Sequence, residues 1–174
     1  MGSATTTSTL HSIFVYGSLQ ADQVVTAILK RIPQSSPAIL HGYHRFSIKG
    51  RIYPAIIPVQ DKNVHGKVLF GITDPELDIL DAFEDVEYER NTVNVSLTDT
   101  LETVECDVYV WKDKLDPDLY GEWHLEEWKK VHMNDFVKMT CTFMEELPGP
   151  ESKPRVETYE TFYHHHQSEN SSMP

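Results

Sequence analysis

Two short segments of the chain combine residue types that could bind a small molecule and react with it. The first, residues 14–20 (FVYGSLQ), places a glycine and a small hydroxyl directly after an apolar run. A glycine there lets the backbone bend and a ligand approach closely, and successive N–H groups can then converge on an oxygen. A helix that begins near Ala21 would add its positive N-terminal end. The segment fits either a site for a carboxylate or polarised carbonyl, or an ordinary strand-to-helix turn.

The second segment, LDAFEDVEYER, carries a carboxylate on the apolar side of a predicted helix. Leu77, Leu80, Asp81 and Glu84 are spaced to share one helical face. If the two leucines face the core, Glu84 is carried toward the interior or a pocket wall. Desolvation there raises the pKa of a carboxylate, which suits a group that takes and returns a proton near neutral pH. Glu84 is therefore the candidate for proton transfer.

Three alternatives to this role of Glu84 stay open in the sequence. The helix could end before Glu84, or Glu84 could form an ordinary ion pair with Arg90, because structural pairs also perturb carboxylates. Asp81 lies on the same face and competes for the same role. Residues 87–89 (EYE) are expected to form a solvated, charged exit from the helix.

Alternating strands and helices are predicted to position these two segments. A short buried strand over residues 12–16 precedes a helix over residues 21–31, whose apolar residues recur at helical spacing. Short apolar stretches with turn residues between them follow over residues 38–59 and 64–72, which is typical of strands. Asp74 then stands where a helix cap is expected.

The rest of the chain predicts two strands and a final helix. On the second strand Cys106 shares the apolar face, so an inert core thiol is expected. Apolar residues spaced three and four apart predict one long C-terminal helix over residues 125–147. His132 on that stripe is expected to be structural. The apolar faces of the two strands are formed by Val93, Val95 and Leu97, and by Val104, Cys106, Val108 and Val110.

This order of elements predicts an α+β fold with a mixed, strongly curved sheet that closes into a small barrel. We expect a disordered leader over residues 1–10, one domain over residues 11–147 and a disordered polar tail over residues 148–174. Gly2 fits a myristoylation pattern, although a plain leader is the preferred interpretation. The adjacent histidines 164–166 rarely form a closed site, so no metal is predicted.

Composition and charge exclude several classes of function. The 27 acidic and 15 basic residues give a formal net charge of -12, which opposes binding to nucleic acid and anionic membranes. No apolar run is long enough to cross a bilayer. The start lacks the apolar region of a secretory signal and the two cysteines lack metal or redox spacing, so a cytoplasmic protein is predicted. The motifs of dinucleotide sites, P-loops and serine hydrolases are absent.

The two reactive segments, taken together and in this order, resemble the γ-glutamylcyclotransferase-like family, and most closely its plant avirulence-induced branch. The stretches GYHRFSIKGRIYPAI, VHGKVLFGI and DPDLYGEWHLEEWKKVHM look like that branch as well, so the resemblance covers residues 11–147. It implies a small mixed β-barrel with flanking helices. It also implies a substrate pocket at the barrel mouth, between the Y-G-S loop and the acidic helix.

The resemblance implies a role for individual residues. The family's catalytic glutamate maps onto Glu84, and Tyr53 is expected to line the same pocket. The implied reaction closes a γ-glutamyl substrate to 5-oxoproline and releases an amine, with no cofactor. The α-carboxylate of that substrate is expected to be attracted by backbone amides or by Arg51. The backbone groups that would hold the γ-glutamyl moiety belong to Val15, Tyr16, Gly17, Ser18, Leu19 and Gln20.

A second interpretation keeps the barrel and pocket as a binding or protein-interaction module without turnover. Resemblance transfers residues more safely than it transfers activity. The acidic C-terminal helix and the tail would then serve partners, although its aromatic stripe is more typical of core packing. The presence of both Glu84 and an intact loop favours retained chemistry.

Overall fold

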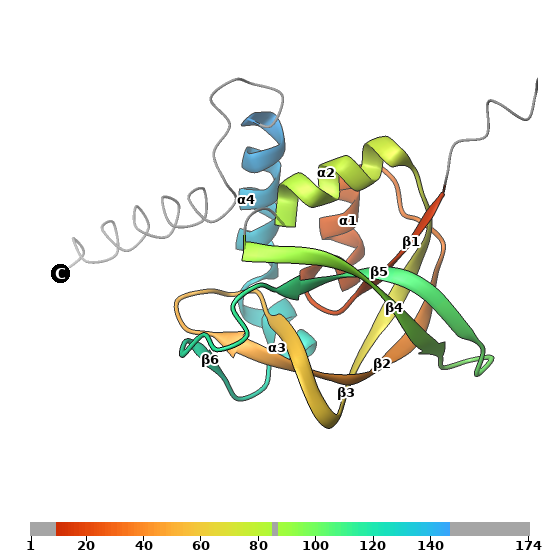
Figure 1. Ribbon diagram of the computed structural model, residues 1–174. Helices are drawn as coiled ribbons and strands as arrows, with labels where there is room; N and C mark the ends of the chain where they lie inside the picture. The colour runs from red at the N-terminus through yellow and green to blue at the C-terminus, as the bar shows by residue number, and fades with distance from the viewer. Residues whose placement is uncertain (1–9, 85–86, 147–174) are drawn as a thin grey trace, which may run out of the picture.

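Within the described residues, 10–84 and 87–146, the computed structural model has five strands that close into a barrel and a short sixth strand beside them (Figure 1). The strands are β1 (His11–Val15), β2 (Ser35–Ile48), β3 (Ala55–Ile72), β4 (Tyr88–Leu97), β5 (Thr103–Trp111) and β6 (Leu119–Tyr120). The helices are the 3-10 helix η2 (Ser18–Gln20), α1 (Asp22–Leu29), α2 (Asp74–Glu84), α3 (Leu125–Val131) and α4 (Met133–Glu146).

The barrel is mixed, as predicted from the sequence. Its strand order is β3-β1-β5-β4-β2, and pairing of β2 with β3 closes the circle. Strands β1 and β5 run parallel, and the other neighbouring strands are antiparallel. The parallel pair places Ile13, in the middle of β1, beside Asp107, in the middle of β5. The α+β class and the small mixed barrel with flanking helices are therefore confirmed.

Two apolar clusters lie on opposite sides of the barrel wall because successive strand residues alternate in direction. On β1, Phe14 joins the barrel interior, whereas Ile13 and Val15 face the layer beneath the helices. Helices α1, α2 and α4 gather on that outer side (Figure 1). The interior cluster contains Phe14, Tyr16, Ala38, Leu40, Ile56, Val64, Val68, Val95, Leu97, Cys106, Val108 and Val110. The predicted apolar faces of β4 and β5 and the core position of Cys106 are thus confirmed.

The predicted C-terminal helix over residues 125–147 is not one helix. His132 has φ -117° and ends α3, with its N–H bonded to the carbonyl of Trp128, and α4 begins at the next residue. The carbonyl of His132 in turn accepts the N–H of Phe136. The apolar spacing continues through the break because it depends on which residues are buried. A continuous stripe therefore does not show that the helix axis stays straight. Trp128, Phe136, Met139 and Phe143 are all buried, so the stripe packs in the core.

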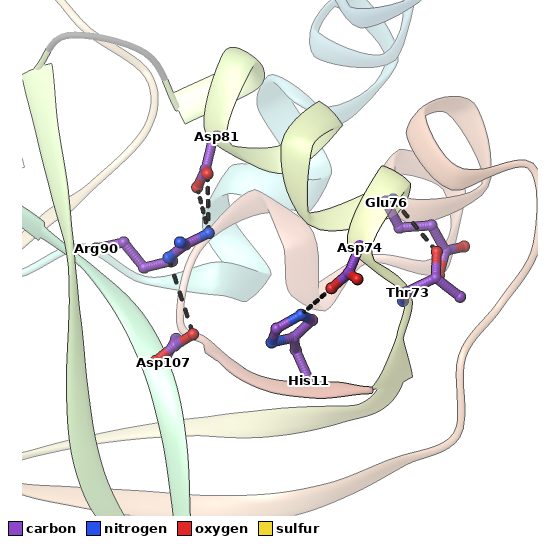
Figure 2. A network of polar contacts seen from close by, with 7 residues as sticks. All are labelled: His11, Thr73, Asp74, Glu76, Asp81, Arg90 and Asp107. Atoms are coloured by element: carbon purple, nitrogen blue, oxygen red, sulfur yellow. Dashed lines mark hydrogen bonds and ion pairs between the residues drawn. The ribbon is translucent and has the colours of Figure 1, made fainter. Parts of the chain in front are cut away.

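Helix α2 begins one residue earlier than the sequence predicted. Thr73 Oγ1 accepts the N–H of Glu76 at 3.3 Å, and Glu76 Oε1 accepts the N–H of Thr73 at 3.0 Å, which is a capping box (Figure 2). Asp74 instead contacts His11 Nε2 at 2.6 Å. The bond from Arg31 holds the pKa of the Glu76 carboxyl below its usual range. The prediction that Asp74 caps the helix is wrong because the preceding threonine does so.

Several predictions fall outside the described residues. The leader up to residue 9, with Gly2, and the tail from residue 147, with its histidines 164–166, belong to this group. In the part of the chain that is described, no helix is both long enough and apolar enough to cross a membrane.

Candidate active site

One pocket brings together the two segments that the sequence singled out. It lies between the turn that follows β1 and the C-terminal end of α2. The lining residues are Phe14, Val15, Tyr16, Gly17, Ser18, Leu19, Tyr53, Pro54, Glu84, Tyr88 and Tyr109. Tyr53, which the resemblance placed at this pocket, is among them.

The turn after β1 leaves three successive amides available to a ligand. The N–H of Gln20 bonds to the carbonyl of Gly17, and that of Ala21 to the carbonyl of Ser18, both at 3.0 Å. Within the described part of the chain, the N–H groups of Gly17, Ser18 and Leu19 have no acceptor. All three residues line the pocket, and Ser18 is buried. Successive free amides of this kind bind anionic or polarised oxygens.

The pocket lining from this segment ends at Leu19. Gln20 is not part of it, and its side-chain amide lies 3.4 Å from the carbonyl of Gly17 instead. The 3-10 helix η2 separates the turn from α1, which starts at Asp22. The sequence predicted two contributions to this site, backbone amides and a helix N-terminus. Only the amides belong to the pocket wall.

Gly17 is required here for a steric reason that differs from the predicted one. Its φ of -125° lies outside the left-handed region, so an unusual bend does not explain the glycine. A Cβ at this position would stand 2.8 Å from both Cγ and Cδ of Pro54. The turn can approach the opposite wall of the pocket only because residue 17 has no side chain.

Glu84 is the last residue of α2 and a half-buried part of the pocket wall. The helix thus reaches Glu84, and the alternative in which it ends earlier is wrong. Glu84 lies close enough to Tyr109 for its charge to raise the pKa of that hydroxyl. The ion pairs of Arg90 are with Asp81 at 2.8 Å and Asp107 at 3.8 Å (Figure 2). The ion pair with Arg90 that the sequence left open for Glu84 is therefore made by Asp81, the other carboxylate on the same helix face.

Asp81 supports the pocket from behind. It accepts a hydrogen bond of 2.7 Å from the hydroxyl of Tyr109 and a second from Arg90, and it is not among the residues that line the pocket. Burial raises the pKa of Tyr109 far above its ordinary value, and the bond to Asp81 and the charge of Glu84 add to this shift. Tyr109 therefore stays protonated. Of the two carboxylates on this face, Glu84 is the one that faces the pocket.

Residues 87–89 are not the uniformly solvated exit that the sequence suggested. Tyr88 is buried, lines the pocket and donates to the carbonyl of Pro54 at 2.7 Å. Glu87 accepts from the Tyr53 hydroxyl at 2.9 Å and from Arg51 at 3.3 Å. Arg51 therefore holds this carboxylate and does not line the pocket. The prediction fails because β4 starts at Tyr88, earlier than the valine alternation that marked the strand.

Pro54, Tyr88 and Tyr109 are pocket residues that the sequence did not identify. Tyr109 lies on the face of β5 opposite Cys106, and its bond to Asp81 shows that α2 covers that face. The strand alternation is the one sequence signal that concerns Tyr109. It assigns this residue to a face of the strand but does not indicate which element covers that face. Among the described residues, no three His, Cys, Asp or Glu side chains lie close enough to hold a metal ion.

The chain is therefore a closed mixed barrel with flanking helices, in which Glu84 and the turn after β1 line a single pocket. The chain belongs to the family described as "Gamma-glutamyl cyclotransferase, AIG2-like", whose model matches residues 13–130. It is 61% identical over 148 residues to AIG2-like protein D of Arabidopsis thaliana, covering 84% of this chain and 97% of the relative. It is 46% identical over 147 residues to Protein AIG2 A of the same plant, covering 84% and 86%.

Solved structures show the same fold. The solution structure of an Arabidopsis thaliana protein is similar at 45% identity with a TM-score of 0.62, covering 82% of this chain and 95% of that one. A γ-glutamyl cyclotransferase from yeast that is specific to glutathione matches with a TM-score of 0.52, covering 91% and 99%. At 15% identity, the yeast comparison establishes the fold alone.

Proposed function

We propose that this protein is a γ-glutamylcyclotransferase that converts a γ-glutamyl amine or γ-glutamyl amino acid into 5-oxoproline and a free amine. The observation that carries the proposal is that Glu84 and the free amides of Gly17, Ser18 and Leu19 line one pocket. Membership of the γ-glutamyl cyclotransferase, AIG2-like family supports the reaction class. We place this activity in the cytoplasm, as the cysteine usage predicts.

In the proposed mechanism Glu84 accepts a proton from the α-amino group of the substrate. The freed nitrogen attacks the γ-carbonyl carbon, and a new C–N bond closes a five-membered ring. Charge that develops on the carbonyl oxygen is stabilised by the amides of the turn. The γ-amide C–N bond then breaks, and protonated Glu84 returns its proton to the departing amine. Ring closure is intramolecular and so gains from proximity, and the reaction needs no cofactor.

Aromatic side chains and backbone dipoles supply the remaining contacts to the substrate. Within the described residues, no lysine, arginine or histidine lines the pocket. We therefore propose that the α-carboxylate is held by backbone amides, because Arg51 is engaged by Glu87 and the hydroxyls of the lining tyrosines donate to other acceptors. An anion bound in this way is stabilised by fixed dipoles instead of by a counter-charge.

The proposal is tested by incubating the protein with γ-glutamyl amino acids, γ-glutamyl-ε-lysine and glutathione. We expect 5-oxoproline and free amine to appear in equal amounts with at least one substrate. Thermal unfolding is measured in parallel, because a ligand that binds only the folded protein raises its melting temperature. Melting shifts without any product would contradict the proposal and support the binding module instead.

A further inference from the structure

A half-buried arginine from β2 holds the backbone of the Y-G-S turn from outside the pocket. Nη1 of Arg45 donates to the carbonyl of Tyr16 at 2.7 Å and to the carbonyl of His65 at 3.0 Å. These two carbonyls lie just beyond the last paired residues of β1 and β3, where Val15 is opposite Lys67. Arg45 therefore bridges the backbones of the two strands where their direct pairing stops. This bridge fixes the start of the turn to the barrel.

The surroundings of Arg45 fix its position. Its guanidinium carbon lies 5.7 Å from the ring centroid of Trp123, within the range of a cation–π contact. Trp123 is itself buried, and its indole N–H donates to the carbonyl of Ile52 at 3.1 Å. On the other side, β3 can approach because residue 66 is glycine: a Cβ there would collide with the carbonyl oxygen of Val15.

Tyr16 is held at both ends by these contacts. Its hydroxyl donates to the carbonyl of Tyr109 at 2.5 Å, and its own carbonyl accepts from Arg45. The Tyr16 carbonyl shares one peptide group with the N–H of Gly17, which lines the pocket. A charged donor on the oxygen of a peptide polarises the whole group, so its N–H becomes a stronger donor.

We infer that Arg45 is a positioning residue of the pocket, which fixes the Tyr16–Gly17 peptide and strengthens the Gly17 N–H as a donor to the ligand. The identity of that ligand oxygen, the γ-carbonyl that gains charge during cyclisation, rests on the proposed function. Burial lowers the pKa of Arg45, and a partly desolvated guanidinium interacts more strongly with a carbonyl than a solvated one does. The motif GYHRFSIKGRIYPAI therefore contributes two residues to the turn, namely Arg45 behind it and Pro54 in front of it.

The test compares Arg45→Met, which removes the donors, with Arg45→Lys, which keeps the charge but loses the planar fork. Arg31→Met is the matched control, because Arg31 also donates to a backbone carbonyl, that of Gly71 at 2.8 Å, and does not line the pocket. The first readout is the backbone ¹⁵N resonance of Gly17 and Gly66 in the ligand-free protein. Both glycines directly follow a carbonyl that Arg45 binds.

We expect both glycine resonances to move to lower frequency in Arg45→Met, to move part of the way in Arg45→Lys, and to stay in place in Arg31→Met. The second readout is turnover. Removing an oxyanion donor outright costs about 10²–10³ in kcat, so weakening one should lower kcat by about tenfold with a smaller change in KM. Arg45→Lys should restore part of that loss.

An unchanged Gly17 resonance in folded Arg45→Met would overturn the inference, and so would a kcat equal to that of Arg31→Met. If Arg45→Met does not fold, the same comparison is made with Arg45→Lys, where an unmoved Gly17 resonance has the same meaning. Failure of the proposed function has a different signature. Wild-type protein would then produce no 5-oxoproline, while the resonances of Gly17 and Gly66 would still respond to Arg45.

Discussion

The hydroxyl of Tyr109 donates a hydrogen bond of 2.7 Å to Oδ1 of Asp81, and this bond joins the wall of the pocket to helix α2. Asp81 is also bound by Arg90, whose guanidinium reaches Asp107 on β5 (Figure 2). The helix that ends at Glu84 is therefore fixed to the strand that carries Tyr109. This connection holds the candidate proton-transfer group against the rest of the pocket.

Tyr109 makes the free energy of unfolding depend on pH in the alkaline range. Its pKa is raised in the folded protein above the ordinary value of 10.0, so its contribution is complete below about pH 10. As the pH rises further, the unfolded chain can ionise this hydroxyl while the folded protein resists, and stability falls. We expect Tyr109→Phe to show a shallower alkaline decline than wild type in urea unfolding between pH 8 and 11. Parallel curves would show that the hydroxyl is not held in its neutral form.

Gly17→Ala should damage the pocket more than the fold. The added Cβ would stand 2.8 Å from the ring of Pro54, so the turn must move. A displacement of about 1 Å can cost about 10² in rate, and overpacking costs about 1–3 kcal/mol of stability. Steady-state kinetics and urea unfolding measure the two effects. Adding Pro54→Ala removes the colliding ring and should recover part of the activity; an equal loss in the double variant would contradict the steric explanation.

The capping box at the start of α2 should be measurable by itself. Thr73→Ala removes the hydroxyl that accepts the Glu76 N–H, so we expect the free energy of unfolding to fall by about 1 kcal/mol. Thr73→Ser keeps the hydroxyl and is the control, with a much smaller loss. The measurement is urea unfolding at pH 7. Equal losses in both variants would assign the effect to the methyl group instead of to the cap.

The two cysteines should differ sharply in reactivity. Burial in the barrel raises the pKa of Cys106 to about 12, whereas Cys141 is exposed on α4. The thiolate is the reactive form, so only Cys141 should be modified in the native protein. We expect one equivalent of an aromatic disulfide reagent to react at pH 7, and two in denaturant. Native labelling that persists in Cys141→Ser would show that the barrel interior is open.

Much of the fold could be predicted from the sequence because it rests on local periodicity. Alternation over Val93, Val95 and Leu97 identified the buried face of β4, and the helical spacing of Val24 and Ile28 identified that of α1. Period and direction are properties of neighbouring residues, so one sequence contains them. The long C-terminal helix fails for the same reason, since a stripe of buried residues does not specify the break at His132.

The pocket could be predicted only in part, because a pocket depends on what lies across from each residue. The turn and Glu84 were recognised by their residue types, and both line the pocket. The role of Pro54 opposite Gly17 depends on a contact between segments far apart in the chain. Tyr109 likewise becomes a wall residue only because α2 covers its face of β5. Local patterns carry no information about such partners.

The central claim is that Glu84 transfers the proton in the cyclisation. Glu84→Gln keeps the shape of the side chain but cannot act as a base. The matched control is Glu89→Gln, which makes the same change at an exposed residue that pairs with Lys114. Both variants should unfold at nearly the temperature of the wild-type protein if the substitution leaves the fold intact.

The measurement that tests this claim most directly is the initial rate of 5-oxoproline release, with the best substrate of the panel, by wild type, Glu84→Gln and Glu89→Gln. We predict a rate about 10²–10⁴ lower for Glu84→Gln, as expected for the loss of general acid–base catalysis, and a rate equal to wild type for Glu89→Gln. Undiminished turnover by folded Glu84→Gln would contradict the account.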